Sequence, residues 1–187
     1  MRRVFVLILG LFLLVASVGG ASAQRAGDSS REDPLPIGTT FVVDDYEITV
    51  LSINPDAEAE VLAENQFNEA APAGDVMVMV RVGVTYTGNE TGDPGWELMY
   101  KAVGSENRGY AMSDKDCGSI PEGEFSVGEL FTDGTSEYNL CWMVSEDEAP
   151  TLVMYVAPLG SSDDEDTVWI SLDPDQPAST PEATPEA

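Results

Sequence analysis

The chain alternates apolar and polar residues with a period of two over most of its length. The longest alternating run covers 75–87, DVMVMVRVGVTYT. One face of this run holds Val76, Val78, Val80, Val82, Val84 and Tyr86, and the other holds Met77, Met79, Arg81, Gly83 and Thr85. Because successive side chains of a strand point to opposite faces of a sheet, the run predicts a long β-strand with one buried face.

Shorter runs of the same kind flank it and are separated by turn residues. They cover 39–43, 46–53, 97–103, 108–112, 125–131, 137–144, 152–157 and 167–172. Asp44 and Asp45 form a tight turn between the first two, and GNETGDPG at 88–95 forms a longer loop. Seven to nine strands with almost no helical periodicity predict an all-β fold, an antiparallel β-sandwich.

One segment departs from the strand pattern. Asn54, Pro55 and Asp56 precede AEAEVLAENQF, which places a capping residue, a proline and acids where a helix begins. We expect a short helix over 55–65, with an irregular crossover as the alternative. A helix of about three turns needs packing against the sheet to persist.

The two ends of the chain differ from the middle. Residues 1–23 combine Arg2 and Arg3, an apolar run and an A-x-A site, which predicts a signal peptide cleaved after Ala23 and a secreted, extracellular protein. The alternative is an uncleaved N-terminal segment that anchors the chain in the membrane. Residues 24–36 read as a polar linker, 37–173 as the sandwich domain, and 174–187, PDQPASTPEATPEA, as a disordered tail.

Charge and composition exclude several functions. The formal net charge is −26 at pH 7, which repels nucleic acid and anionic membrane surfaces. The chain contains no histidine, so Ser-His-Asp and Cys-His catalysis and histidine-ligated zinc are excluded. Any catalysis is left to carboxylates, lysine, tyrosine or serine.

The two cysteines, Cys117 and Cys141, predict a structural disulfide because thiols pair in an oxidising compartment. A free reactive thiol, the alternative, would lack a histidine to activate it. In the strand at 137–144, Tyr138, Leu140 and Trp142 share one face and Cys141 lies on the other. We therefore expect a local bridge outside the centre of the sandwich.

Several motifs in order resemble a known family. They are IGTTF at 37–41 with DYEITV at 45–50, then Gly74-Asp75 before the long strand. Next come 96–103 ahead of Gly109-Tyr110, and LFTDG at 130–134 before the strand that ends at Val144. This order is similar to that of small exported bacterial domains of unknown function with a telokin-like, immunoglobulin-like sandwich, as in the mycobacterial immunoprotective extracellular protein. The resemblance covers about 37–172, implies that fold and export, and supplies no catalytic residues.

Two acidic clusters are candidate sites. Asp163, Asp164, Glu165 and Asp166 offer oxygen ligands to calcium, although a solvated turn explains them as well. Glu146, Asp147 and Glu148 could supply the acid and base of a hydrolase, although acids are so abundant here that such groups arise by chance.

Four aromatic residues are the candidates to reach the surface and bind a partner: Trp96, Tyr100, Tyr110 and Trp169. The alternative is that they cover a sheet.

We therefore expect an exported, non-catalytic binding module for an extracellular protein or glycan, with no cofactor and no catalytic residues. A calcium-dependent ligand-binding domain is the second interpretation, and a carboxylate-based hydrolase is the third.

Overall fold

The computed structural model describes residues 23–25, 29–161 and 166–175. The predicted signal peptide lies outside these ranges except for Ala23, as does the predicted tail from residue 176 onward. Within the described ranges, no helix is long and apolar enough to cross a membrane.

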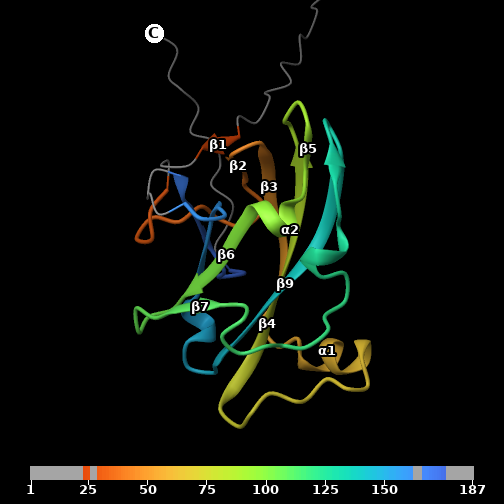
Figure 1. The fold of residues 1–187 in the computed structure, drawn as a ribbon. Coiled ribbons are helices and arrows are strands. Elements are labelled where there is room, and N and C mark those ends of the chain that lie inside the picture. The colour runs from red at the N-terminus through yellow and green to blue at the C-terminus, as the bar shows by residue number, and fades with distance from the viewer. Residues whose placement is uncertain (1–22, 26–28, 162–165, 176–187) are drawn as a thin grey trace, which may run out of the picture.

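Two β-sheets form the framework of the fold (Figure 1). The first has the order β1-β2-β3-β4-β9 and comprises β1 (Gln24–Arg25), β2 (Thr40–Val43), β3 (Tyr46–Asn54), β4 (Asp75–Tyr86) and β9 (Thr135–Ser145). The second has the order β11-β10-β6-β7 and comprises β11 (Val168–Ser171), β10 (Val153–Pro158), β6 (Leu98–Val103) and β7 (Gly109–Ala111). Only β1, which runs parallel to β2, departs from the antiparallel arrangement among these strands.

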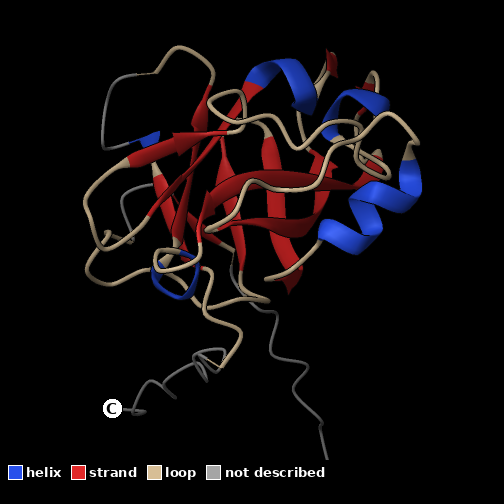
Figure 2. Cartoon of the chain, turned by 90° about the horizontal axis from the view of Figure 1, so that it is seen from below, coloured by secondary structure: helices blue, strands red, loops and turns tan. Residues whose placement is uncertain are grey.

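Smaller elements lie around the two sheets. They are the two-stranded ladder of β5 (Thr91–Gly92) and β8 (Leu130–Phe131), the helices α1 (Glu58–Glu64) and α2 (Pro94–Glu97), and the 3₁₀ turns η1 (Glu124–Ser126) and η2 (Ala149–Thr151). Figure 2 shows the helical segments at the periphery of the strands.

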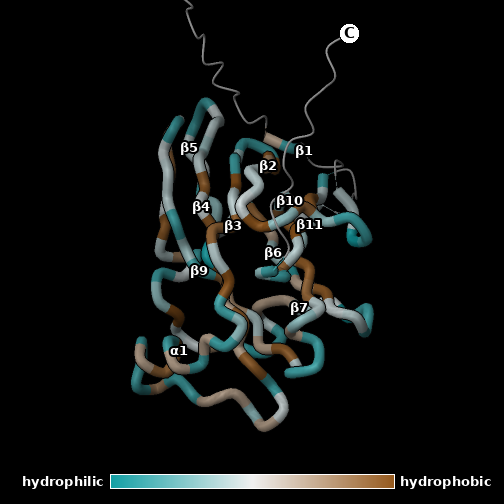
Figure 3. Tube along the Cα trace, turned by 180° about the vertical axis from the view of Figure 1, so that it is seen from behind, coloured by the Kyte–Doolittle hydropathy of each residue, from teal (hydrophilic) through white to brown (hydrophobic). Residues whose placement is uncertain are grey.

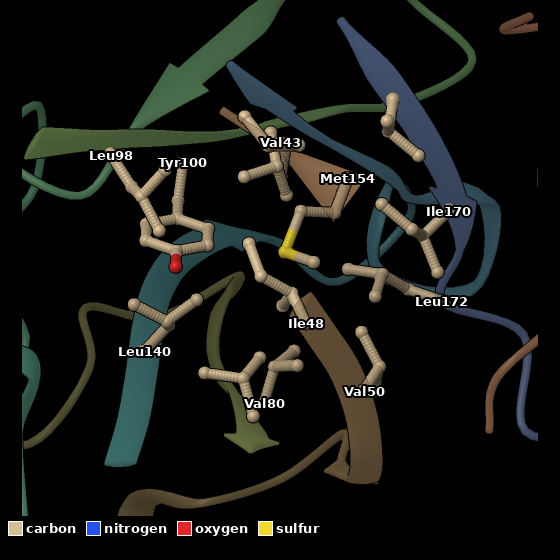
Figure 4. Close-up of a cluster of buried hydrophobic side chains, with 14 of the residues drawn as sticks. Val43, Ile48, Val50, Val80, Leu98, Tyr100, Leu140, Met154, Ile170 and Leu172 are labelled. Atoms are coloured by element: carbon tan, nitrogen blue, oxygen red, sulfur yellow. The ribbon is translucent and has the colours of Figure 1, made fainter. Parts of the chain in front are cut away.

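The two sheets pack face to face over one hydrophobic core. Side chains from both sheets point toward each other in it, among them Ile48 and Leu140 from the first sheet and Tyr100, Met154 and Ile170 from the second (Figure 4). Hydrophobic residues concentrate on these strands, whereas the tip beside β5 is hydrophilic (Figure 3). The predicted all-β, antiparallel sandwich is confirmed.

Strand β4 is buried on both faces at its first half. Val78, Val80 and Val82 enter the main core as the alternation predicts. Met77 and Met79, on the opposite face, enter a second cluster with Ala57, Val61, Cys117, Cys141 and Met143. Helix α1 lies beside this end of β4 (Figure 1) and supplies Val61 to the cluster. The outer face of the first sheet is therefore covered here and not solvated.

The predicted disulfide is confirmed. Cys117 and Cys141 are bonded, with their Cα atoms 6.3 Å apart and a sequence separation of 24. Both are buried in the second cluster, while Trp142 is completely buried in the main core. The strand phase thus placed Cys141 correctly on the outer side of the sheet.

The predicted helix is shorter than its sequence signals suggest. It begins at Glu58, and neither Asn54 nor Pro55 occupies the expected capping positions. The Asn54 side chain instead accepts a hydrogen bond from the Asp56 backbone N–H at 3.1 Å. The Ala57 N–H donates to the Met77 carbonyl at 2.8 Å. These bonds to the turn and to β4 hold residues 55–57 outside the helix.

The predicted strand at 125–131 is wrong for most of its length. Residues 124–126 form η1, and only Leu130 and Phe131 pair in a sheet. Gly128 has φ +70°, a left-handed conformation that interrupts an extended strand. Alternation alone does not reveal such a break, and the result leaves Phe125 63% exposed.

Residues of the segment predicted as a polar linker lie against the sandwich. The Leu35 side chain is buried, its N–H donates to the Trp169 carbonyl, and its carbonyl accepts from the Ser171 N–H, both at 2.8 Å. The Arg31 guanidinium donates to the Gly104 carbonyl at 2.7 Å. Leu35 is one apolar residue in a polar segment, so average composition gives no sign of these contacts.

Removing the disulfide by replacing both Cys117 and Cys141 with alanine should lower the free energy of unfolding by about 3 to 4 kcal/mol, because the bridge restricts the unfolded chain. Urea unfolding of the oxidised wild type and the double variant measures this difference. A loss below about 1 kcal/mol would show that the bridge stabilises the fold little.

Candidate functional site

A groove of about 840 Å³ opens beside the second sheet. Its walls come from β6, from the end of β7 and the residues after it, from the loop that carries Cys117, and from η1. The lining residues include Trp96, Leu98, Met99, Tyr100, Lys101, Asp116, Glu124 and Phe125. A volume of this size is typical of a cleft that holds a small molecule or a short peptide.

Two exposed aromatic side chains stand together at one end of the groove. The ring centroids of Trp96 and Phe125 are 5.1 Å apart with 46° between the ring planes. Trp96 is 66% exposed and Phe125 is 63% exposed, so the pair is fixed mainly by its own contact. Aromatic pairs of this kind are enriched where proteins bind partners.

Local sequence positions this pair. Pro94 begins α2, and the Asp93 carboxylate caps it by accepting from the Gly95 N–H at 3.1 Å. A side chain at position 95 would place its Cβ 2.9 Å from the Glu124 carbonyl oxygen. Glycine at that position therefore lets α2 and η1 approach closely, which brings Trp96 beside Phe125.

Glu124, the residue before Phe125 in η1, is buried. Glu124 is 9% exposed, and no other described residue forms an ion pair or a side-chain hydrogen bond with its carboxylate. Burial raises the pKa of the Glu124 carboxyl group. The groove thus contains an acid that lacks a cationic partner within the described part of the chain.

Two phenol groups lie near this acid. The buried hydroxyl groups of Tyr100 and Tyr138 are hydrogen-bonded to each other. Burial raises the pKa of both phenols, and the Glu124 carboxylate adds to this effect. Both hydroxyl groups therefore remain protonated at neutral pH, and neither can serve as a phenolate base.

One edge of β6 is open along the groove. On the side of β10, β6 pairs from Leu98 to Val103. On the side of β7, only Lys101 to Val103 pair, opposite Ala111 to Gly109. In the described sheet, Leu98, Met99 and Tyr100 therefore have no strand partner on that side.

The charged groups are distributed unevenly along the groove. Lys101 is the single lysine or arginine among the lining residues, and the register places it at the β7 end. Glu124 lies at the other end, where η1 contacts α2. The arrangement can bind an elongated ligand with a cationic group near Glu124, and it contains no histidine to act as a general base.

The four predicted aromatic residues do not form one surface. Trp96 is exposed at the groove, whereas Tyr100 and Tyr110 are 4% and 5% exposed. The expectation that these two tyrosines reach the surface is wrong, because β6 and β7 turn them into the main core. Trp169 is half-buried on β11 and packs on Tyr155, with ring centroids 4.9 Å apart.

The predicted calcium ligands are mostly outside the described ranges. Asp163, Asp164 and Glu165 lie there, and the exposed Asp166 accepts a hydrogen bond from the Ser161 hydroxyl at 3.0 Å. Among the residues that the structure describes, no group of three acidic or cysteine side chains is arranged to hold a metal ion.

The acidic turn at 146–148 is divided between surface and interior. Glu146 and Asp147 are exposed, whereas Glu148 is 1% exposed. The Glu148 carboxylate accepts from the Ser105 hydroxyl at 2.6 Å and from the Glu106 N–H at 3.0 Å. The turn does not present these three carboxylates together, and Glu148 organises the loop at 104–106.

Sequence reasoning missed Glu124 and Phe125 as members of the site. Phe125 begins the run that predicts a strand over 125–131, and Glu124 precedes it. Nothing in GEFSVGELF distinguishes an exposed phenylalanine from a buried one. Gly123 and Gly128 on either side were the available signal for an irregular segment.

The isosteric change Glu124→Gln should raise Tm at pH 7 and have little effect near pH 3. A raised pKa in the folded protein means that this group stabilises the fold below its usual pKa, and that this contribution is lost as pH rises through the raised value. Glutamine does not ionise, so the variant avoids the loss. Thermal unfolding across this pH range measures the difference.

Glu129→Gln is the matched control for this measurement, since it removes the same charge from an exposed position nearby. Removing any acid from a chain of net charge −26 reduces repulsion. Equal Tm gains in the two variants would show that Glu124 is not destabilised by burial.

No protein-family model and no curated protein matches this chain. Three solved bacterial structures are similar to it. A conserved hypothetical protein from Bacillus anthracis is 11% identical, with 66% of this chain and 89% of that chain covered and a TM-score of 0.42. An uncharacterized beta-sandwich protein from Clostridium difficile 630 is 10% identical, with 82% and 97% covered and a TM-score of 0.45. The yjhA protein from Bacillus subtilis is 12% identical, with 74% and 99% covered and a TM-score of 0.45. Because these TM-scores lie below 0.5, the fold assignment rests on the strand pairing and core described above.

Proposed function

We propose that this protein is an exported, non-catalytic β-sandwich module that binds an extracellular protein or glycan in the groove beside β6. The observation that carries the proposal is the exposed pair of Trp96 and Phe125 at the mouth of that groove. Burying large aromatic side chains against a partner removes apolar surface from water and contributes favourably to the free energy of binding.

Export is supported by two features of the chain. The first 23 residues have the pattern of a signal peptide, and the Cys117–Cys141 disulfide suits an oxidising compartment. We also propose membership of the exported bacterial family with the telokin-like sandwich, on the order of motifs in the sequence.

A binding role is favoured over an enzymatic one by the chemistry of the groove. The Tyr100 phenol in its wall and the Tyr138 phenol hydrogen-bonded to it have raised pKa values, and the chain has no histidine. Its buried acid, Glu124, lies beside aromatic rings and lacks the arrangement of nucleophile and base that covalent catalysis needs. These features suit recognition of a ligand rather than its chemical conversion.

The proposal is tested by measuring affinity for extracellular peptides, proteins and glycans on an array, without calcium. The double variant Trp96→Ala with Phe125→Ala should bind its ligand about tenfold more weakly or worse, because it removes both anchors. Both side chains are mostly exposed, so Tm should change little.

Trp169→Ala is the control, since it removes an aromatic residue that packs on Tyr155 away from the groove. Its affinity should match that of the wild type. Binding that survives loss of Trp96 and Phe125, or turnover of any arrayed compound, would contradict the proposal.

A further inference from the structure

We propose that the occupant of the groove is an extended peptide segment of another protein that pairs with the open edge of β6 and places an arginine side chain between the Trp96–Phe125 pair and the Glu124 carboxylate. This inference rests on the proposed function and specifies the chemistry of the ligand.

The backbone of such a segment has a template in β6. Leu98, Met99 and Tyr100 extend beyond the last pair with β7, and this edge lines the groove. The Leu98 N–H already donates to the Pro94 carbonyl of α2, so an added strand would pair with the remaining backbone groups of this edge. An added strand there would continue the line of β7 along the same side of β6. Extended peptides commonly bind in this way, by adding a strand to an exposed sheet edge.

The residues at the Glu124 end of the groove indicate where the arginine side chain would bind. The guanidinium group is planar, stacks on aromatic faces and forms paired hydrogen bonds with a carboxylate. Trp96 and Phe125 offer exposed faces there, and Glu124 offers an acid without a cationic partner among the described residues. Lysine lacks the planar group and matches this combination less well.

Charge complementarity favours a basic segment over an acidic one. The chain carries a formal net charge of −26, so its field attracts cations and repels acidic ligands. The single lining cation, Lys101, is at the opposite end of the groove, beside the last pair with β7. It therefore does not neutralise Glu124.

The inference is tested with the peptide acetyl-Ser-Val-Arg-Val-Ser-amide, which alternates as a strand does, and with the same peptide carrying citrulline in place of arginine. Citrulline keeps the shape of the side chain and removes its charge. Calorimetric or NMR titration at about 0.15 M salt limits long-range attraction. The arginine peptide should bind about tenfold more tightly than the citrulline peptide.

Two protein variants separate the site from general attraction to an acidic protein. Glu124→Gln should weaken binding of the arginine peptide about tenfold and abolish its advantage over the citrulline peptide. Glu129→Gln removes the same charge at an exposed position and should leave the affinity within about twofold of the wild type. Trp96→Ala should weaken binding of both peptides.

The inference is overturned if the two peptides bind equally, if Glu124→Gln and Glu129→Gln weaken binding equally, or if the arginine peptide does not saturate the protein at millimolar concentration. Each of these results leaves the proposed function standing when an arrayed ligand still requires Trp96 and Phe125. If no ligand requires those two residues, both proposals fail.

Discussion

The pairing of β4 with β9, continuous from Asp75 opposite Ser145 to Thr85 opposite Thr135, is the constraint on which the rest of the structure depends. Its register sets Val78 beside Trp142, facing the second sheet, and Met79 beside Cys141, facing outward. One ladder thus supports two hydrophobic clusters, one on each face of the first sheet. A shift by a single residue would exchange the two faces and bury the wrong side chains.

The outer cluster connects this ladder to the groove. Cys141 is held on β9 by the register, and its bond to Cys117 fixes the loop that forms one wall of the groove. Two residues before Cys141 in β9, the Asn139 N–H donates to the Glu122 carbonyl at 2.8 Å. This bond holds the chain just before η1. Glu124 and Phe125 are therefore positioned by contacts with β9, although they belong to an irregular segment.

The groove exists because the two sheets have unequal edges. Strand β9 continues to Ser145, but its counterpart at the edge of the second sheet, β7, covers only half of β6. The uncovered half meets α2 and η1, which contribute the exposed aromatic pair and the buried acid. An open strand edge is a hazard for unwanted pairing, and an edge recessed in a groove restricts that pairing to segments that fit.

The sequence by itself determined most of the strands, the sandwich and the bridge. The strands and the sandwich depend on local alternation, and the bridge depends on the presence of two cysteines. The alternating pattern alone predicts the strand at 75–87, and it predicts that Cys141 lies on the face of its strand opposite to Trp142. Only the tertiary structure decided that Met77 and Met79 are buried, that Tyr100 and Tyr110 face the core, and that Trp96 meets Phe125. Those outcomes depend on which segments cover a given face, and contacts between residues far apart in sequence leave no periodic signal in the chain.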